Sequence, residues 1–265
     1  MMEEENMART NNGAGSSASA AGKGNAPKAG AAKSPHGVTT LAVDIGGTGI
    51  KAILLDEQDK PIGERHRTKT PQPATPKAVL AVVADLAKQS GPFDRVSVGF
   101  PGVVRDGVTK TAHNLDQQWV GFHLKAALGA KLSRPVRVCN DAGVQGYGVI
   151  SGKGLELAIT LGTGLGSALF IDGRLVPNLE LAHHPFRGKK TYEEFLGKKA
   201  MEKLGKKKWN KKLAQAITQL EALFNYDHLY IGGGNVSQVE IELPRNVTKT
   251  SNIAGLYGGI ALWRD

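Results

Sequence analysis

Short apolar runs recur through the first half of the chain and predict the strands of a sheet. The first three follow one another closely, as antiparallel neighbours do, and two later runs are typical of buried strands. Between them, apolar residues at helical spacing predict helices. The predicted strands are Thr40–Asp44, Ile50–Leu55, Ile62–Thr68, Val96–Phe100 and Val136–Cys139, and the predicted helices are Pro76–Ser90, Phe122–Leu132 and Ala142–Ile150.

The second half of the chain repeats this plan. Its predicted strands are Leu155–Leu161, Ser167–Ile171 and His228–Ile231, and its predicted helices are Tyr192–Leu204, Lys211–Phe224 and Ile253–Trp263. Two successive sets of strands and helices indicate two α/β lobes with a cleft between them. The last helix is expected to pack back on the first lobe.

Two segments, 43–61 and 159–177, share one sequence pattern and align without a gap. Gly46 corresponds to Gly162 and Asp56 to Asp172, and the apolar positions between them also match. Each copy predicts a β-hairpin with a Gly/Thr turn, whose backbone N–H groups and hydroxyl form a small concavity suited to phosphate oxygens. Two such loops facing one cleft are the layout of a phosphotransferase.

Composition excludes several classes of protein. The chain has 265 residues, and its first 37 or so residues contain no aromatic side chain, which predicts a disordered tail. The acidic start MMEEEN has no apolar core, so a secretory signal is not expected, and no apolar run is long enough to span a membrane. A single cysteine, Cys139, excludes an internal disulfide and a multi-cysteine zinc site. We therefore expect a cytoplasmic protein.

The net charge of +10 is concentrated in one segment. Residues 187–212 carry eleven basic side chains against three acidic ones, an excess of +8. A solvated helical face is one interpretation, and an electrostatic track for a polyanion is the other. Nucleic acid is one candidate polyanion, but only Tyr192, Phe195 and Trp209 are there to stack on bases.

Candidate chemistry begins with Asp44–Lys51, the sequence DIGGTGIK. An aspartate that ends a buried strand needs a partner, and Mg²⁺ beside phosphate, directly or through water, is one such partner. An ordinary hairpin turn with a capping aspartate is the alternative. The candidate phosphate-binding residues are Gly46, Gly47, Thr48, Gly49 and Lys51 in the first hairpin, and Gly162, Thr163, Gly164 and Gly166 in the second.

Asn140 and Asp141 follow a predicted strand and begin a predicted helix. Taken alone they are a common helix N-cap pair. The functional interpretation places Asp141 at the floor of the cleft, as the general base that takes a proton from an attacking hydroxyl.

These motifs together resemble the ROK family of sugar kinases over residues 38–265. Asp44–Lys51 is similar to the family's DxGGTxxK motif, Leu161–Gly166 to its second phosphate loop, Gly99–Gly102 to its GxPG turn, and Glu180–His183 to its ExGH motif, with Ala182 in place of the usual glycine. The resemblance implies a catalytic Asp141 and a sugar site made of Pro101, Gly102, Asn114, Asn140, Asp141, Glu180, His183 and Glu193. Asn, Asp, Glu and His can pair with the donor and acceptor roles of hexose hydroxyls.

The resemblance also implies the fold and its boundaries. The family has the two-lobed actin-like and hexokinase-like ATPase fold, which is ribonuclease H-like, and the hairpins above would be its duplicated phosphate loops. We expect a disordered tail at 1–37, an N-terminal lobe at 38–140 completed by a C-terminal helix at 253–265, and a C-terminal lobe at 141–252.

Departures from the family pattern indicate which branch of the family the chain resembles. Many members hold zinc with a CxCGxxGC cluster, which is missing here, so no zinc is expected. The repressors of the family carry an N-terminal helix-turn-helix, where this chain has a Gly/Ala/Ser-rich segment. The zinc-free pattern and the lysines resemble the family's polyphosphate glucokinase branch. A polyphosphate track would use Lys199, Lys203, Lys206, Lys207 and Lys208.

The sequence therefore predicts a polyphosphate-dependent glucokinase that makes glucose 6-phosphate with Mg²⁺ at Asp44. Mannose as a second acceptor and ATP as a second donor stay open, with Gly233 and Gly234 as nucleotide-binding candidates or as a plain turn. The alternatives are a strictly ATP-dependent hexokinase of the same family and a non-catalytic sugar sensor or polyanion-binding regulator. We expect no nucleic-acid partner, no membrane, and a monomer or homodimer.

Overall fold

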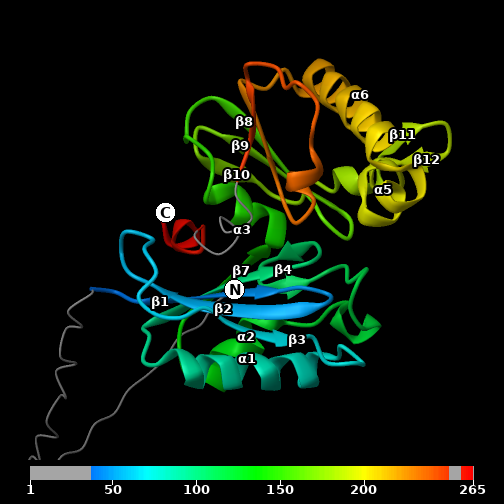
Figure 1. The fold of residues 1–265 in the computed structure, drawn as a ribbon. Helices are drawn as coiled ribbons and strands as arrows, with labels where there is room; N and C mark the ends of the chain where they lie inside the picture. The colour runs from blue at the N-terminus through cyan, green and yellow to red at the C-terminus, as the bar shows by residue number, and fades with distance from the viewer. Residues whose placement is uncertain (1–36, 251–257, 265) are drawn as a thin grey trace, which may run out of the picture. The chain divides into compact units, whose positions relative to one another are not determined.

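Two five-stranded sheets with one strand order form the framework of the protein (Figure 1). The structure, a computed structural model, describes residues 37–250 and 258–264. The first sheet has the order β3-β2-β1-β4-β7 and the second the order β10-β9-β8-β13-β14. In each, a hairpin of antiparallel strands is followed by two parallel strands. The internal repeat predicted from the sequence is therefore present as a repeated topology.

The first sheet packs against two helices on one face. Its strands are β1 (Thr40–Ile45), β2 (Gly49–Leu55), β3 (His66–Lys69), β4 (Arg95–Phe100) and β7 (Val136–Asn140), and its helices are α1 (Pro76–Ser90) and α2 (Leu124–Leu132). Leu41, Val43 and Ile45 alternate along β1 and join the core formed with α1 and α2. Ala42 points to the other face, where it packs with Ile260 near the C-terminus.

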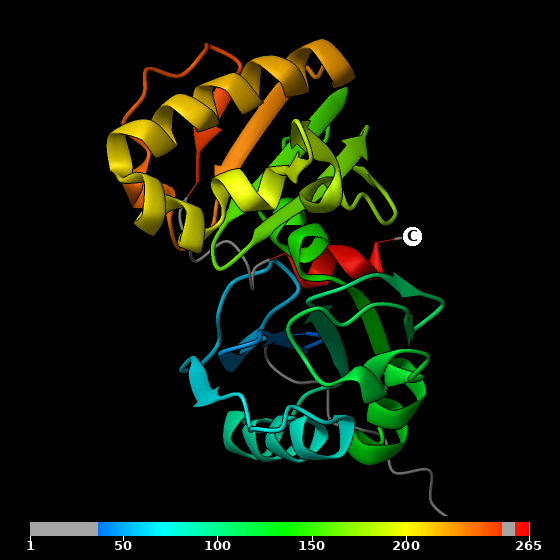
Figure 2. The same cartoon turned by 90° about the vertical axis from the view of Figure 1, so that its right-hand side faces the viewer.

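The second sheet carries the lysine-rich helices. Its strands are β8 (Leu155–Leu161), β9 (Leu165–Ile171), β10 (Arg174–Val176), β13 (His228–Gly232) and β14 (Val247–Lys249), and its helices are α4 (Tyr192–Leu196), α5 (Lys198–Leu204) and α6 (Lys206–Phe224). Trp209, Leu213 and Ile217 lie on one side of α6 and pack against the sheet. Four of the helix's lysines are therefore exposed, namely Lys206, Lys207, Lys208 and Lys211. Figure 2 shows α6 lying across the sheet.

Short elements complete the chain. They are the hairpins β5 (Val104–Arg105) with β6 (Val108–Thr109) and β11 (Pro185–Arg187) with β12 (Lys190–Thr191), and the 3₁₀ helices η1 (Gln117–Trp119), η2 (Leu181–His183), η3 (Val236–Gln238) and η4 (Ile260–Trp263). None of the helices in the described ranges is long and apolar enough to cross a membrane.

Helix α3 (Asp141–Tyr147) joins the sheets and contacts both of them. It touches β4 and β7 of the first sheet and β8 and β9 of the second. A Cβ atom on Gly146 would lie 2.5 Å from the Phe170 ring, so only glycine permits this approach. The two views agree that α3 lies between the sheets (Figures 1 and 2).

The C-terminal segment is held on the first sheet. Trp263 Nε1 donates a hydrogen bond to Ser97 Oγ at 2.8 Å, and Ser97 Oγ donates to the Gly259 carbonyl at 2.6 Å. The guanidinium carbons of Arg95 and Arg137 lie 4.9 and 4.8 Å from the centre of the Trp263 ring. Contacts group the described residues into one compact unit, so the bounds predicted for the two lobes, 38–140 and 141–252, stay a prediction.

Several predicted elements differ from the structure. The strand predicted at 62–68 forms only at His66–Lys69, because the chain bends at Gly63. The helix predicted at 192–204 is divided at Gly197, whose extended backbone ends α4 and begins α5. Helix α6 starts earlier than the predicted Lys211. The predicted helix 253–265 lies partly outside the described residues, and its described part is the 3₁₀ helix η4.

Replacing Trp263 by alanine should destabilise the protein. Trp263→Ala removes one hydrogen bond and two cation–π contacts, together worth about 2–3 kcal/mol of unfolding free energy. Urea unfolding would measure the loss. Leu223→Ala, on an exposed part of α6, is the control and should change stability by less than about 0.5 kcal/mol. Equal stability of the two variants would show that the C-terminal segment contributes nothing.

Candidate active site

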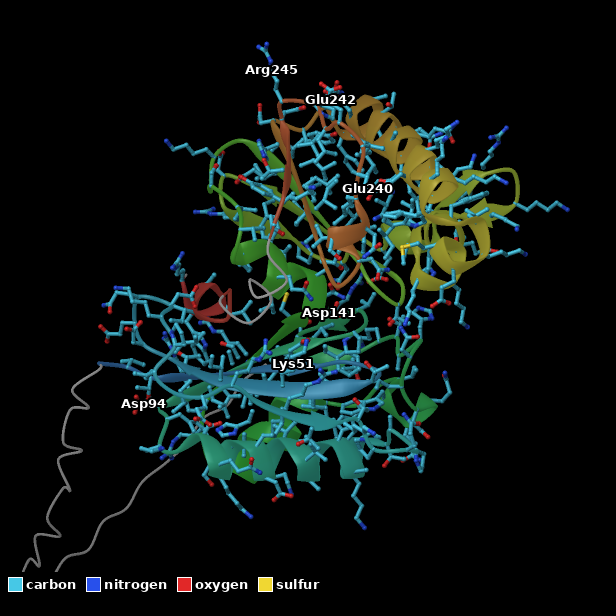
Figure 3. All side chains as sticks on the ribbon, in the orientation of Figure 1. Lys51, Asp94, Asp141, Glu240, Glu242 and Arg245 are labelled. Carbon is cyan, nitrogen blue, oxygen red and sulfur yellow. The ribbon has the colours of Figure 1, made fainter. Side chains whose placement is uncertain are left out.

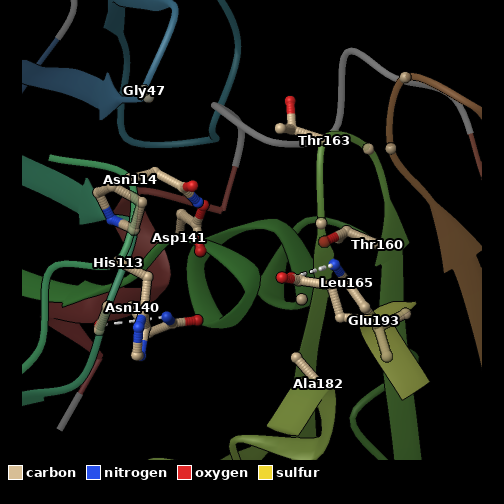
Figure 4. A pocket seen from close by; sticks show the side chains of 18 of the residues that line it. Gly47, His113, Asn114, Asn140, Asp141, Thr160, Thr163, Leu165, Ala182 and Glu193 are labelled. Carbon is tan, nitrogen blue, oxygen red and sulfur yellow. Dashed lines mark hydrogen bonds between the residues drawn. The ribbon is translucent and has the colours of Figure 1, made fainter. Parts of the chain in front are cut away.

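A cavity of about 440 Å³ collects residues from both sheets and from α3. Its walls are the turns of the two repeated hairpins, the N-terminus of α3, and the segments before and after η2. In Figure 3, Asp141 lies between the two sheets and Lys51 lies on the first sheet below it, whereas Glu242 and Arg245 lie at the far end of the second sheet. Figure 4 shows the cavity from close by.

The first hairpin turn joins β1 to β2 and holds an ion pair. Asp44 is opposite Lys51 in the antiparallel register, and Lys51 Nζ lies 2.8 Å from Asp44 Oδ2. The Gly46 amide donates to the Gly49 carbonyl at 3.0 Å and closes the turn. Gly49 thus shapes the turn without lining the cavity, while Gly46, Gly47, Thr48 and Lys51 do line it.

The second hairpin turn joins β8 to β9 and is held by hydrogen bonds from residues outside the hairpin. The Gly162 amide donates to the Gly164 carbonyl at 3.0 Å, a bond that closes this turn one residue more tightly than the first. The Lys198 amide and the Asn235 side chain both donate to the Gly162 carbonyl, each at 3.0 Å. The break at Gly197 places Lys198 at this loop, so the lysine-rich helices start at the second turn.

Glu193 lies against this second turn. Its Oε2 accepts a hydrogen bond from the Leu165 amide at 3.2 Å, drawn as a dashed line in Figure 4. A Cβ atom on Gly164 would lie 2.0 Å from the same oxygen, so a larger residue at position 164 would displace the carboxylate. Glu193, expected to close the sugar site, therefore also touches the candidate phosphate loop.

The N-terminus of α3 presents Asn140 and Asp141 to the cavity. Asn140 Oδ1 accepts from the Ala142 amide at 2.9 Å, and its Nδ2 donates to the Gly102 carbonyl at 3.2 Å. Asn140 is therefore a helix cap and a cavity residue at once. Asp141 Oδ1 accepts from the Ala142 amide at 2.8 Å.

The environment of Asp141 favours its neutral form. Burial, with a smaller effect of the nearby carboxylates of Asp44 and Glu180, raises the pKa of the Asp141 carboxyl to about 7, against the lowering effect of the Ala142 amide. A carboxyl with a pKa near neutrality can accept and return a proton, as a general base must.

The remaining wall carries Glu180 and two histidines. Glu180 Oε2 lies 3.9 Å from His183 Nε2, and the rings of His113 and His183 are 4.4 Å apart between centroids. Burial raises the pKa of Glu180, against the lowering influence of His183 and His113. This wall is polar and has the mixed donors and acceptors that suit hydroxyl groups.

Most of the predicted site residues line this one cavity. They are Asp44, Gly46, Gly47, Thr48, Lys51, Pro101, Gly102, Asn114, Asn140, Asp141, Gly162, Thr163, Gly164, Gly166, Glu180, His183, Glu193, Gly233 and Gly234. The five predicted track lysines, Lys199, Lys203, Lys206, Lys207 and Lys208, are exposed and lie outside its lining. Lys206 pairs with Glu240 at 2.5 Å.

The cavity also contains residues that the sequence analysis missed. They are His113, Gln145, Thr160, Leu165, Ser167, Ala182, Lys198 and Asn235. Gln145 could have been found, since it follows Asp141 by one helical turn. The position of Lys198 depends on the break at Gly197, which the helical pattern conceals.

The residues present suit some metal ions better than others. No group of three or more His, Cys, Asp or Glu side chains in the described ranges could hold an ion alone. Asp44 and Asp141 do face one cavity beside two candidate phosphate loops. This set fits Mg²⁺, which typically takes one or two carboxylates together with substrate phosphates and water.

The comparisons identify the class of protein: the chain belongs to the ROK family, whose sequence pattern matches residues 40–179. It is 34% identical to the polyphosphate glucokinase of Mycobacterium tuberculosis over 248 residues, which are 86% of this chain and 91% of that protein. The crystal structure of an inorganic polyphosphate/ATP-glucomannokinase from Arthrobacter sp. strain KM is 35% identical and matches with a TM-score of 0.78, over 86% of this chain and 100% of that chain.

The same fold is also found in a structure with lower sequence identity. A ROK family glucokinase from Streptomyces griseus, in complex with glucose and AMPPNP, has 21% identity and a TM-score of 0.69, over 84% of this chain and 98% of that one. The prediction of the two-lobed, actin-like and hexokinase-like fold is confirmed by these matches and by the repeated sheet topology.

Replacing Asp141 by asparagine should stabilise the protein in a pH-dependent way. The Asp141 pKa rises from an ordinary 3.8 to about 7 on folding, so the folded protein binds this proton more tightly than the unfolded chain. The wild type therefore loses stability relative to Asp141→Asn as the pH rises from about 4 to about 7, and the difference is constant above that range. Urea unfolding at pH 5, 6, 7 and 8 would measure it.

The control for this series is Asp85→Asn, which removes a carboxylate that is 67% exposed on α1. Its effect on stability should hardly change with pH. A difference between wild type and Asp141→Asn that is the same at every pH would contradict the raised pKa.

Proposed function

We propose that this protein is a polyphosphate-dependent glucokinase, which transfers the terminal phosphoryl group of polyphosphate to the 6-hydroxyl of glucose. The observation that carries the proposal is the position of Asp141. In Figure 4 it lies between Gly47 and Thr163 of the two hairpin turns on one side and His113, Asn140 and Ala182 on the other. A base placed between a phosphate site and a hydroxyl-binding site suits phosphoryl transfer to an alcohol.

The sugar would occupy the polar end of the cavity. Asn114, Asn140, Glu180, His183 and Glu193 offer hydrogen-bond partners there. Pro101 and Gly102 line the same region, and Gly102 fixes the Asn140 amide through its carbonyl. A site that pairs each hydroxyl discriminates against analogues that leave its polar groups unpartnered.

The reaction balances with the groups at hand. The glucose 6-hydroxyl gives its proton to the Asp141 carboxylate, and its oxygen forms a bond to the terminal phosphorus. The bond between that phosphorus and the bridging oxygen breaks, and the shortened polyphosphate keeps the electron pair. Amide groups of the two hairpin turns and the Lys51 ammonium would hold the transferring phosphate in place.

Mg²⁺ would bind at Asp44, directly or through water, with the Asp141 carboxylate facing the same space. Bound there, the ion would offset negative charge on the donor phosphates. Lys51 already pairs with Asp44 at 2.8 Å, so the ammonium can exchange partners as phosphate and metal arrive. The absence of a zinc requirement stays a prediction.

The donor would run from the second turn onto the lysine-rich helices. Lys198 lines the cavity and its amide is bonded to the turn, and α5 and α6 continue from it with exposed lysines. Helix α6 has Lys206, Lys207 and Lys208 in its first turn and no acidic residue there. Cations at a helix N-terminus oppose the helix dipole, and a bound polyanion would relieve that repulsion.

A second donor is favoured by one specific observation. Gly233, Gly234 and Asn235 line the cavity, and Asn235 is bonded to the second turn through Gly162 and Leu161. This segment could support the base and ribose of ATP, and the similar Arthrobacter protein carries both donors in its name. We therefore include ATP as an alternative donor and mannose as an alternative acceptor. A non-catalytic sensor would have no need of Asp141 beside the two phosphate turns.

Asp141→Asn should lower kcat by about 10²–10⁴-fold, because the variant cannot accept the proton of the 6-hydroxyl. Glucose affinity, measured by calorimetry, should stay within about twofold, because an amide still accepts and donates hydrogen bonds. In the wild type, kcat/KM for glucose should fall as the pH drops below about 7, since protonated Asp141 is no base. Full activity of Asp141→Asn would refute the assignment.

Neutralising Lys203, Lys206, Lys207 and Lys208 together with glutamine should weaken the use of long polyphosphate far more than the use of ATP. ATP has only three phosphates and would not reach these side chains. The loss with polyphosphate should shrink as salt rises, because counterion release drives polyanion binding. Steady-state kinetics with both donors at several salt concentrations would measure it.

The matched control neutralises four exposed lysines around the first sheet, Lys60, Lys77, Lys88 and Lys131. It changes the net charge equally and should leave both donors unaffected apart from a small general effect of charge. Equal losses with polyphosphate and ATP in the first variant would indicate a structural role for those lysines.

A further inference from the structure

Two histidine rings meet across the cavity. His113 follows β6 in the first half of the chain, and His183 ends η2 in the second half. Their ring centroids are 4.4 Å apart, with an angle of 50° between the planes. Both residues line the cavity, so this contact connects its two walls.

The pair lies at the acceptor end of the cavity. In Figure 4, His113 is beside Asn140, on the side of Asp141 away from Gly47 and Thr163. The donor phosphates belong with those two turns, so the histidines face the part of the sugar that is remote from the transferring phosphoryl group.

The pyranose ring then fixes which hydroxyl they face. Carbon C6 is attached to C5, and C2 lies across the ring from C5. With the 6-hydroxyl at Asp141, the 2-hydroxyl points to the opposite end of the site. Position C2 is also where mannose differs in configuration and where amino sugars carry an acetamido group.

The histidine rings are free to bind a hydroxyl there. Among the described residues His113 has no hydrogen bond, and His183 has only Glu180, whose Oε2 lies 3.9 Å from Nε2, beyond hydrogen-bond distance. The His183 side chain is 44% exposed, and His113 is also exposed in the open cavity. A neutral imidazole has one N–H donor and one acceptor nitrogen, which match the two roles of a hydroxyl.

We propose that His113, positioned by the contact of its ring with His183, binds the 2-hydroxyl of the hexose and so sets the preference of the enzyme at C2. The inference rests on the proposed function. A sugar without that hydroxyl would leave the His113 ring with water alone. An N-acetyl group at C2 would collide with the two histidine rings, so N-acetylated hexoses should be poor acceptors.

The test compares glucose with 2-deoxyglucose in three variants. His113→Ala removes the ring, His113→Phe keeps an aromatic ring against His183 without its nitrogens, and His113→Asn keeps hydrogen-bonding capacity without the ring. Affinity for each sugar is measured by calorimetry, and kcat, the sugar KM and the donor KM by steady-state kinetics. His184→Ala is the control, because His184 is adjacent in sequence but does not line the cavity.

Losing one hydrogen bond typically costs about 0.5–1.5 kcal/mol, so His113→Ala and His113→Phe should weaken glucose binding by about 2–13-fold. Binding of 2-deoxyglucose should change by less than about twofold, and the donor KM should not change. His113→Asn should recover part of the glucose affinity. The His184→Ala variant should behave as the wild type with both sugars.

Other outcomes would overturn the inference. Equal losses with both sugars, or a His113→Phe variant with full glucose affinity, would mean that the ring acts only through packing. Unchanged affinity in all three variants would mean that His113 does not touch the sugar. A wild-type protein that phosphorylates no glucose with either donor would refute the proposed function instead, and calorimetry with glucose would still test His113.

Discussion

The arrangement of this site depends on how closely α3 packs against the second sheet. Gly146 lies so near Phe170 that no side chain fits between them, and the helix contacts strands of both sheets. Its N-terminus is thereby fixed where the two repeated hairpins converge. Asp141 sits at that end, half-buried and close to the carboxylates of Asp44 and Glu180, which gives it a pKa suited to moving a proton. Fold and chemistry are linked through this one helix.

Repetition explains why the cavity has two similar walls. Each sheet begins with a hairpin whose turn is closed by one amide-to-carbonyl bond, Gly46 to Gly49 and Gly162 to Gly164. The first turn is supported by an ion pair between Asp44 and Lys51, while the second is held by Lys198 and Asn235. The two turns are therefore related in sequence but differ in their closing bond and in their surroundings, and only the second turn continues into the lysine-rich helices.

Much of the fold was predictable, because periodicity and turn residues are local signals. Helix α1 and strand β8 have the predicted bounds, and the hairpin repeat predicted the shared topology. The site residues with strong motifs were also found from sequence. His113 and Lys198 were not, since their roles arise from contacts across the cavity and from a helix break at Gly197. Those contacts join residues far apart in the chain, and neither composition nor spacing encodes them.

The hydrogen bond from Ser97 to Gly259 spans 162 residues of sequence. A ribosome therefore completes β4 long before it makes the segment that covers that face of the sheet. Until then Ala42, Ile53 and Leu55 lack the cover of Ile260. During translation of the second half, this apolar patch of the first sheet is therefore open to chaperones or to other chains.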